Sequence, residues 1–262
     1  MAGNVLITGA TTGIGYELAK LFAKDKYELI IIARNETRLS ETASSLIKDY
    51  NVKVKFIPKD LSKTDSAKEI FAELKNENIS VDMLVNNAGF GDQGAFAESE
   101  LSNDLDMIHL NITSLVILNR LFLDDMLKKN SGRIMNVAST AAFQPGPFMA
   151  MYYATKAFVL SFSEAVAEEL SGTDVTVSCL CPGPTETEFQ NRAGIKETKM
   201  MSGKRFTVMT AAEVALTGYK EMMKGKKIII PGFANKAGTF FVKILPRKII
   251  SKVTRSMNSI KV

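Results

Sequence analysis

Two residues that could transfer a proton, Tyr152 and Lys156, are four positions apart in a stretch with helical character. Residues at i and i+4 lie one above the other on a helix, so the ammonium group would lie close to the phenol. A free tyrosine has a pKa of about 10, and a nearby positive charge lowers that pKa. We therefore expect Lys156 to lower the pKa of Tyr152 so that the phenol can exchange a proton with an alcohol oxygen. Tyr153 fits the same geometry, and the spacing alone is also compatible with ordinary helix packing.

A glycine-rich loop near the N-terminus, residues 8–15, has the sequence TGATTGIG. It follows a short apolar run, 5–7, and precedes an amphipathic stretch, 16–24, which together predict a strand, a turn and a helix. Glycines let the backbone approach a pyrophosphate, whose charge the helix N-terminus then stabilises. The loop is predicted to bind a dinucleotide through Gly9, Thr11, Thr12, Gly13, Ile14 and Gly15.

These features and several further motifs, in this order along the chain, resemble the short-chain dehydrogenase/reductase family in its shorter form. The resemblance extends from about residue 3 to 232. Within the family, the chain is most similar to bacterial reductases that carry a basic C-terminal extension. The motifs are the glycine loop, Asp60-Leu61, Asn86-Asn87-Ala88-Gly89, Asn111, Ser139, Tyr152 with Lys156, and Pro182-Gly183.

The resemblance implies an enzyme that transfers a hydride between a nicotinamide cofactor and a carbonyl or secondary alcohol. By the family mechanism, Tyr152 is the general acid/base, Lys156 lowers its pKa and binds the nicotinamide ribose, and Ser139 orients the substrate oxygen. Asn111 holds a water against Lys156. The alternatives are a 3-oxoacyl thioester reductase and a non-catalytic nucleotide sensor. The remaining cofactor contacts that the resemblance implies are Asp60 and Leu61 at the adenine, Asn87, Ala88 and Gly89 at the adenine-side ribose, and Pro182, Gly183, Thr185 and Thr187 around the nicotinamide.

The end of the second predicted strand indicates NADP(H) as the cofactor. An enzyme that uses NAD normally has an acidic residue there, which binds the ribose 2′-hydroxyl. Here Ala33 occupies that position and Arg34 follows it. A guanidinium group suits a 2′-phosphate, and Arg38 adds charge from the next helical turn. Thr12 stands where some family members carry a second basic residue, so some use of NAD(H) stays open.

Apolar runs alternate with helical patterns along the chain, which predicts βαβ units. We expect an α/β, doubly wound, Rossmann-like parallel sheet of seven strands with helices on both faces. The predicted strands are 4–8, 28–33, 53–57, 82–86, 132–137, 174–180 and 228–230. The predicted helices are 14–25, 36–50, 64–77, 100–128, 151–171 and 211–224.

The chain has 262 residues with 46% hydrophobic content, enough to form one domain with a sizeable core. We expect a catalytic domain at 1–233 and a C-terminal extension of the same domain at 234–262. The first predicted strand begins too early to leave room for a signal peptide, and the apolar runs are too short to span a bilayer, so we expect a cytoplasmic protein. Cys179 and Cys181 are expected to be buried structural thiols, and no metal site is expected.

Substrate recognition is assigned to residues 141–149 and to a lid at 186–210. Apolar side chains in and near these segments would close over a lipophilic carbonyl compound, or would simply pack the lid on the body. They are Phe90, Phe143, Phe148, Met149, Phe189, Ile195, Met200, Met201, Phe206, Val208 and Met209. We also expect a homo-dimer or homo-tetramer, formed through the helices at 100–128 and 151–171, and no nucleic-acid partner.

Positive charge is concentrated near the C-terminus. Residues 222–262 contain ten Lys/Arg and no Asp/Glu, whereas the remainder of the chain carries a net charge of −5. We expect a pair of basic amphipathic helices, divided by Pro246, that either packs on the lid or a second subunit or contacts an anionic membrane surface or acidic partner. Packing is favoured. On the second helix, Lys248, Lys252 and Arg255 share one face, and Ile250, Val253 and Met257 lie nearly opposite.

Overall fold

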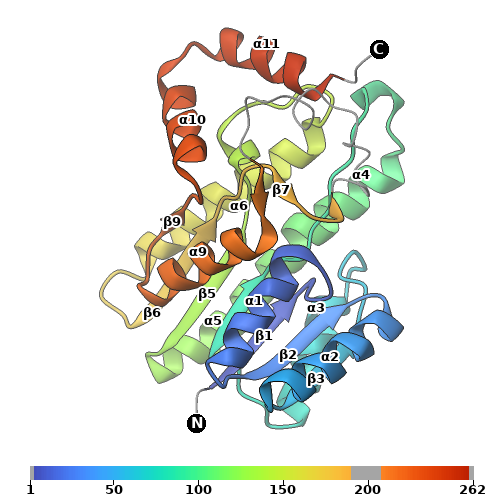
Figure 1. Cartoon of the computed structure of the whole chain (residues 1–262), viewed down its shortest axis with the longest axis vertical. Helices are drawn as coiled ribbons and strands as arrows, with labels where there is room; N and C mark the ends of the chain where they lie inside the picture. Colours follow the sequence, from blue (N-terminus) through green and yellow to red (C-terminus); the bar gives the residue numbers. More distant parts are fainter. Residues whose placement is uncertain (1–2, 190–207, 260–262) are drawn as a thin grey trace.

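The computed structural model describes residues 3–189 and 208–259, which fold around a seven-stranded sheet (Figure 1). Its strand order is β3-β2-β1-β4-β5-β6-β9, and every neighbouring pair is parallel. The predicted doubly wound sheet is confirmed, with each strand boundary within one residue of the prediction. The strands are β1 (Asn4–Thr8), β2 (Glu28–Ala33), β3 (Val54–Pro58), β4 (Met83–Asn86), β5 (Gly132–Val137), β6 (Val175–Leu180) and β9 (Ile228–Ile229).

Helices cover both faces of the sheet, as predicted. Alternate side chains of a strand point to opposite faces, so Leu29 and Ile31 of β2 join one core cluster, and Ile30 and Ile32 join the other. The first cluster packs under α1 (Gly13–Lys24), α2 (Glu36–Tyr50) and α9 (Ala211–Met223). The second packs under α3 (Ser66–Asn76), α5 (Leu115–Lys129) and α6 (Ala150–Glu169).

The helix predicted at 100–128 has a feature that its sequence did not indicate. It consists of α4 (Leu101–Ile108), a π-helical turn η2 (His109–Ser114) and α5, which continue into one another. By length and composition alone, the 29 residues Leu101–Lys129 could cross a membrane. In this fold, Leu118, Phe122 and Met126 of α5 are buried against the sheet, so core packing accounts for the apolar character.

The ends of the predicted lid are joined by a short ladder. The parallel strands β7 (Thr185–Glu186) and β8 (Met209–Thr210) pair Thr185 with Met209 and Glu186 with Thr210. The prediction did not include this pair. Two short 3-10 turns, η1 (Phe96–Glu98) and η3 (Thr140–Phe143), precede α4 and α6, respectively.

The C-terminal residues form the predicted helix pair, α10 (Phe233–Ile244) and α11 (Arg247–Asn258), with Pro246 between them. Helix α10 leads away from the sheet, and α11 runs across the end of the molecule opposite the N-terminus (Figure 1). Ile250 is buried, whereas Val253, predicted on the same face, is 53% exposed. Most of the lid on which this pair was predicted to pack lies outside the described residues.

Both cysteines are buried free thiols, as predicted, at the end of β6. Their sulfur atoms lie 3.7 Å apart, too far for a disulfide but within hydrogen-bonding distance for two thiols. The contact with Cys179, together with burial, raises the pKa of the Cys181 thiol. A thiol that stays protonated is a weak nucleophile, which favours a packing role for Cys181.

Candidate active site

The glycine loop lies at the carboxyl end of β1, where the chain order in the sheet reverses between β1 and β4. Ligands of doubly wound sheets bind at this point. A methyl group on Gly15 would lie 2.3 Å from the carbonyl oxygen of Gly9, so only glycine fits there. Gly9 and Gly13 have φ angles of +66° and +55°, which other residues rarely adopt.

Thr8, at the end of β1, joins this loop to the end of β4. Its hydroxyl accepts hydrogen bonds from the backbone N–H groups of Asn87 (3.0 Å) and Ala88 (2.9 Å). The Asn87 side chain donates to the carbonyl oxygens of Thr8 (3.0 Å) and Gly9 (3.1 Å). The sequence analysis did not assign a role to Thr8, although a threonine directly before such a loop can bond its neighbours.

The glycine loop leads directly into the N-terminus of α1, an arrangement that suits a pyrophosphate. Thr12 directly precedes α1, and Ile14 packs against the core from its first turn, so the helix N-terminus is directed at the loop. A methyl group on Gly13 would lie 2.9 Å from the Thr187 side chain. Thr187 thus lies beside the loop, as a residue that contacts the same dinucleotide must. The chain's residues fit a dinucleotide cofactor.

The predicted adenine contacts have structural roles as well. The Asp60 carboxylate accepts a hydrogen bond from Ser62 N at 3.0 Å, so it stabilises the turn before α3. Leu61 is buried, and its carbonyl oxygen accepts from the Ser114 hydroxyl at 2.6 Å. This places both residues at the carboxyl side of β3, next to the π turn.

Pro182 and Gly183 follow β6 and lie under the start of α10. A methyl group on Gly183 would lie 2.3 Å from the Asn235 amide oxygen, so helix and loop pack closely. Thr185 belongs to β7, is buried, and donates its hydroxyl to the Gly183 carbonyl at 2.9 Å. The residues assigned to the nicotinamide thus form one packed turn.

The two arginines predicted to bind a 2′-phosphate differ in their surroundings. Arg34 directly follows β2 and is exposed. Arg38 forms a two-fold ion pair with Glu188, at 2.8 and 2.5 Å, across 150 positions of sequence. The Glu188 carboxylate raises the pKa of Arg38 and offsets its positive charge. Arg38 is therefore less available to a phosphate than the sequence suggested, and Arg34 is the principal candidate.

The proposed catalytic residues meet near Gly89, which follows β4. A methyl group on Gly89 would lie 3.0 Å from Asn111 Oδ1 and 3.3 Å from Lys156 Nζ. Lys156 is buried and donates to the Val137 carbonyl at 2.8 Å. Its ammonium lies 5.8 Å from the centre of the Tyr152 ring. The i, i+4 proximity predicted from the sequence is therefore present.

The π turn positions Asn111. Its amide donates to the Phe90 carbonyl (2.9 Å) and the Thr155 hydroxyl (3.0 Å), and its oxygen accepts from Phe90 N (3.1 Å). Such turns are frequent at functional sites because they redirect one side chain out of a regular helix. Thr155, which the sequence analysis did not single out, connects this asparagine to the helix that carries Tyr152.

The prediction that Tyr152 has a lowered pKa is wrong for the protein without a bound cofactor. Burial raises the pKa of Tyr152 to about 12, although a hydrogen bond with the Ser139 hydroxyl lowers it. Burial also lowers the pKa of Lys156 to about 8. Taking a charge out of water disfavours the charged form of both groups, so burial shifts both pKa values toward the neutral forms. Tyr152 is thus a protonated phenol at neutral pH.

Apolar side chains surround the Tyr152 ring. The Phe189 ring lies 5.3 Å from it, and Met107, Met149 and Phe90 belong to the same cluster. The predicted apolar surface is therefore present for Phe90, Met149 and Phe189. The predicted members Ile195, Met200, Met201 and Phe206 lie outside the described residues.

The last turn of α11 closes one side of this cluster, through a residue that the sequence analysis missed. Asn258 is 1% exposed, donates its amide to the Pro147 carbonyl at 2.9 Å and accepts from the Tyr153 hydroxyl at 3.3 Å. The backbone carbonyl oxygen of Asn258 accepts a hydrogen bond from the Gln93 side-chain amide at 2.6 Å. An asparagine in a basic tail carries no sequence signal for such contacts.

Comparison with known proteins assigns the family. A family model described as short chain dehydrogenase matches residues 3–198. The chain is a short-chain dehydrogenase/reductase. The site described above thus belongs to an oxidoreductase of a family that uses a nicotinamide cofactor.

Three known proteins illustrate what this short-chain dehydrogenase/reductase is similar to. The chain is 42% identical over 184 residues to the uncharacterized oxidoreductase YvrD of Bacillus subtilis, covering 70% of this chain and 69% of that protein. It is 30% identical over 213 residues to the ketoacyl reductase HetN of Nostoc, covering 81% and 72%. A solved short-chain dehydrogenase from Sphingobium yanoikuyae in complex with NADPH is 28% identical, with a TM-score of 0.81 and coverage of 94% and 97%.

Proposed function

We propose that the protein is an NADP(H)-dependent reductase of lipophilic carbonyl compounds, with Tyr152 as the general acid. The observation that carries this proposal is the convergence of Asn111 and Lys156 at Gly89, with Tyr152 above the Lys156 ammonium and Ser139 bonded to the phenol. A bound nicotinamide would supply or accept the hydride. The chain's residues then have to hold the substrate oxygen and deliver a proton to it.

Tyr152 and Ser139 are suited to that step. The phenol is protonated at neutral pH, because burial raises its pKa, so it can donate a proton to an oxygen that gains negative charge. The Ser139 hydroxyl, bonded to the phenol, would orient the same oxygen. Lys156 and Asn111 would return a proton to Tyr152 through the buried polar cluster around Gly89. By microscopic reversibility, the same groups would accept the proton when an alcohol is oxidised.

The preference for NADP(H) rests on the end of β2. Arg34 is exposed there, and Ala33 stands where a carboxylate would bind a ribose hydroxyl. A guanidinium can form paired hydrogen bonds with a phosphate. The NADPH in the Sphingobium relative is consistent with this proposal.

The apolar cluster around Tyr152 supports a lipophilic substrate, because it offers few polar partners to a hydrophilic one. A 3-oxoacyl thioester is the second candidate. The name of the Nostoc relative favours it, and so do two cations, Lys252 and Arg255, that line an adjacent cavity and suit an anionic carrier group.

A substrate panel with the Tyr152→Phe variant tests the proposal. Ketones, aldehydes, steroids and 3-oxoacyl thioesters are supplied with NADPH, and NADPH oxidation is followed by absorbance. Tyr152→Phe should lose at least ~10²-fold in turnover, the lower bound for a general acid, while binding NADPH normally. Tyr153→Phe is the matched control. Loss in Tyr153→Phe alone would reverse the assignment, and NADPH binding without turnover of any compound would support a nucleotide sensor instead.

We also infer that the protein forms a homo-dimer or homo-tetramer through α5 and α6. The exposed side of α6 carries Ala154, Phe158 and Ala165, and the Phe158 ring stacks on Phe162 at 5.8 Å. An apolar helix face of this kind is usually covered by another surface.

The buried free thiols favour a reducing compartment, so we infer that the protein acts in the cytoplasm.

A further inference from the structure

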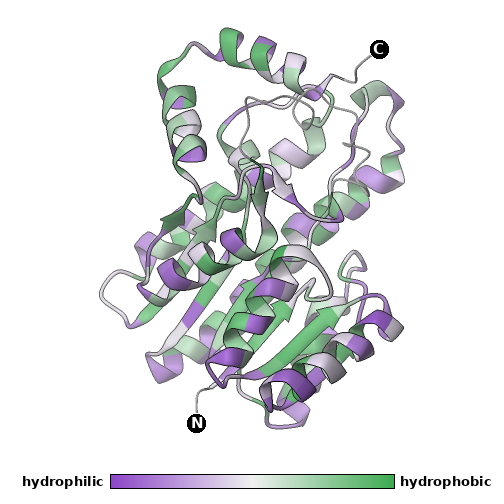
Figure 2. Cartoon of the chain, viewed as in Figure 1, coloured by the Kyte–Doolittle hydropathy of each residue, from purple (hydrophilic) through white to green (hydrophobic). Residues whose placement is uncertain are grey.

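The C-terminal helices expose an unusual amount of apolar surface. Seven of the fifteen exposed large hydrophobic side chains in the described part of the chain lie between residues 233 and 253. We name this region the C-terminal surface. Its apolar members are Phe233, Phe240, Phe241, Ile244, Leu245, Ile249 and Val253. Figure 2 shows hydrophobic and hydrophilic residues alternating along α10 and α11, at the end of the molecule away from the N-terminus.

Helix α10 presents its more apolar side to solvent. Phe233, Phe240 and Ile244 recur at intervals of seven and four residues, so they share one side of the helix. They are 87%, 60% and 64% exposed. The side that packs on the body carries Thr239, which is buried, and Asn235, which bonds the Pro231 carbonyl at 2.7 Å. This is the reverse of an ordinary surface helix, whose apolar side faces the core.

Cations accompany the apolar residues. Every charged residue of the C-terminal surface is basic and exposed, and in the described part of the chain none of them forms an ion pair. The acids that pair with lysines elsewhere in the structure are absent from 233–259. The cations are Lys236, Lys243, Arg247, Lys248, Lys252 and Arg255.

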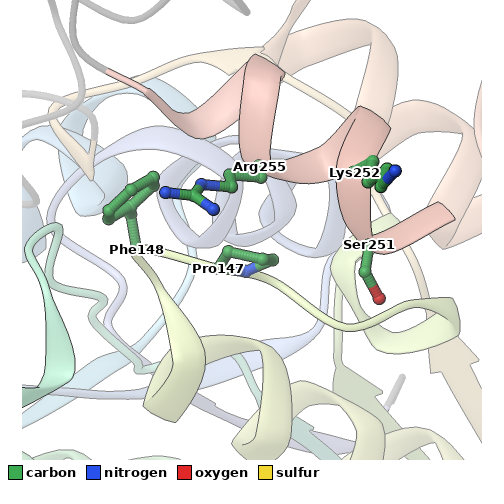
Figure 3. A pocket seen from close by; sticks show the side chains of 5 residues that line it. All are labelled: Pro147, Phe148, Ser251, Lys252 and Arg255. Atoms are coloured by element: carbon green, nitrogen blue, oxygen red, sulfur yellow. The ribbon is translucent and has the colours of Figure 1, made fainter. Parts of the chain in front are cut away.

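A cavity beside the exposed side of α11 adds a place for an anionic group. It measures about 350 Å³ and is lined by Pro147, Phe148, Ser251, Lys252 and Arg255 (Figure 3). The Arg255 guanidinium extends toward the Phe148 ring and lies 5.6 Å from its centre. A guanidinium, an ammonium and a hydroxyl are the groups that bind phosphate in proteins.

We propose that the C-terminal surface binds the face of an anionic lipid bilayer. Phe240, Phe241 and Ile244 would enter the headgroup–acyl boundary, while the lysines and arginines contact the lipid phosphates. A second copy of the chain fits less well. In a two-fold contact the same surface meets itself, so six cations would face six cations with no acid between them. This proposal goes beyond the reductase function and does not depend on it.

Co-sedimentation of the full-length protein with lipid vesicles tests the proposal. At low salt, the protein should sediment with phosphatidylglycerol–phosphatidylcholine vesicles and much less with pure phosphatidylcholine, and raised salt should release it. Lys243→Gln/Lys248→Gln should weaken binding by roughly 5-fold per cation, which corresponds to ~1 kcal/mol each. Phe240→Ser/Ile244→Ser should weaken it by at least ~10-fold.

Matched controls lie on α2. Ile47 and Lys48 are exposed there, and α2 is far from α10 and α11 in Figure 1. Ile47→Ser and Lys48→Gln should therefore leave vesicle binding unchanged. No binding to anionic vesicles at low salt would overturn the proposal, as would equal binding to both kinds of vesicle. It would also be overturned if Phe240→Ser/Ile244→Ser reduced the molecular mass measured by light scattering, because the surface would then join copies of the chain.

Discussion

The buried ammonium of Lys156 leads to a quantitative prediction about stability and pH. Burial lowers its pKa from 10.5 to about 8 in the folded protein. The unfolded chain keeps the ordinary value, so between these two pH values the unfolded state binds more protons than the folded state. The free energy of unfolding therefore rises with pH across this window, and below it the full cost of burying the charge is present.

The size of the effect follows from the shift. At 1.36 kcal/mol per pH unit, the lowered pKa corresponds to a cost of about 3 kcal/mol at neutral pH. About 2 kcal/mol of that cost should disappear between about pH 7 and about pH 9.5. Tyr152 has the opposite sign. Its pKa is raised to about 12, so it destabilises the folded protein only at higher pH, and it does so equally in variants of Lys156.

Urea unfolding of the cofactor-free protein and of Lys156→Met at the two pH values measures this. Methionine keeps the length of the side chain but carries no charge. The variant's advantage in unfolding free energy should shrink by about 2 kcal/mol as the pH rises. Lys48→Met, at an exposed site on α2, should show no such change. A difference between native protein and Lys156→Met that stays constant with pH would refute the reasoning.

Three further predictions concern the cofactor site, the tail and the assembly. Arg34→Ala should weaken the binding of NADPH by roughly 10- to 150-fold in fluorescence titrations, since a bond to a charged group contributes about 1.5–3 kcal/mol. The binding of NADH should weaken far less, and equal losses for the two cofactors would contradict the assignment. Asn258→Ala leaves the part-buried Pro147 carbonyl and the buried Tyr153 hydroxyl without their partner, so urea unfolding should show a loss of about 1–3 kcal/mol. A loss within the error of the native curve would mean that α11 is not fixed there. Phe158→Glu should lower the mass measured by light scattering, and a native mass equal to that of a monomer would exclude assembly through α6.

The sheet and most helices could be predicted because their signals are local. The strand residues 28–33 are almost all aliphatic, and 36–50 begins after Asn35, whose side chain accepts from Arg38 N. Such patterns depend on neighbours within one or two turns. The seven-strand arrangement followed from the regular alternation of these elements.

Other features depend on contacts across long sequence distances, and these could not be predicted. The ion pair between Arg38 and Glu188 joins residues 150 positions apart, and the contacts of Asn258 join the tail to the loop before α6. The π turn at 109–114 has no recognisable signal. The direction of the Tyr152 pKa shift was predicted wrongly because burial depends on Phe189 and other distant residues, whereas the spacing to Lys156 shows only one of the two competing effects.

The ladder between β7 and β8 has a consequence for how the protein can diverge. It fixes residues 185–186 against 209–210, so both ends of the intervening segment are held next to the cofactor turn. Doubling the length of a loop whose ends are fixed costs only about 0.6 kcal/mol in closure entropy. Insertions and deletions after Phe189 and before β8 should therefore leave the sheet and the cofactor site, including Thr187, undisturbed. Substrate range and cofactor binding can thus change independently over evolutionary time, although they meet at one tyrosine.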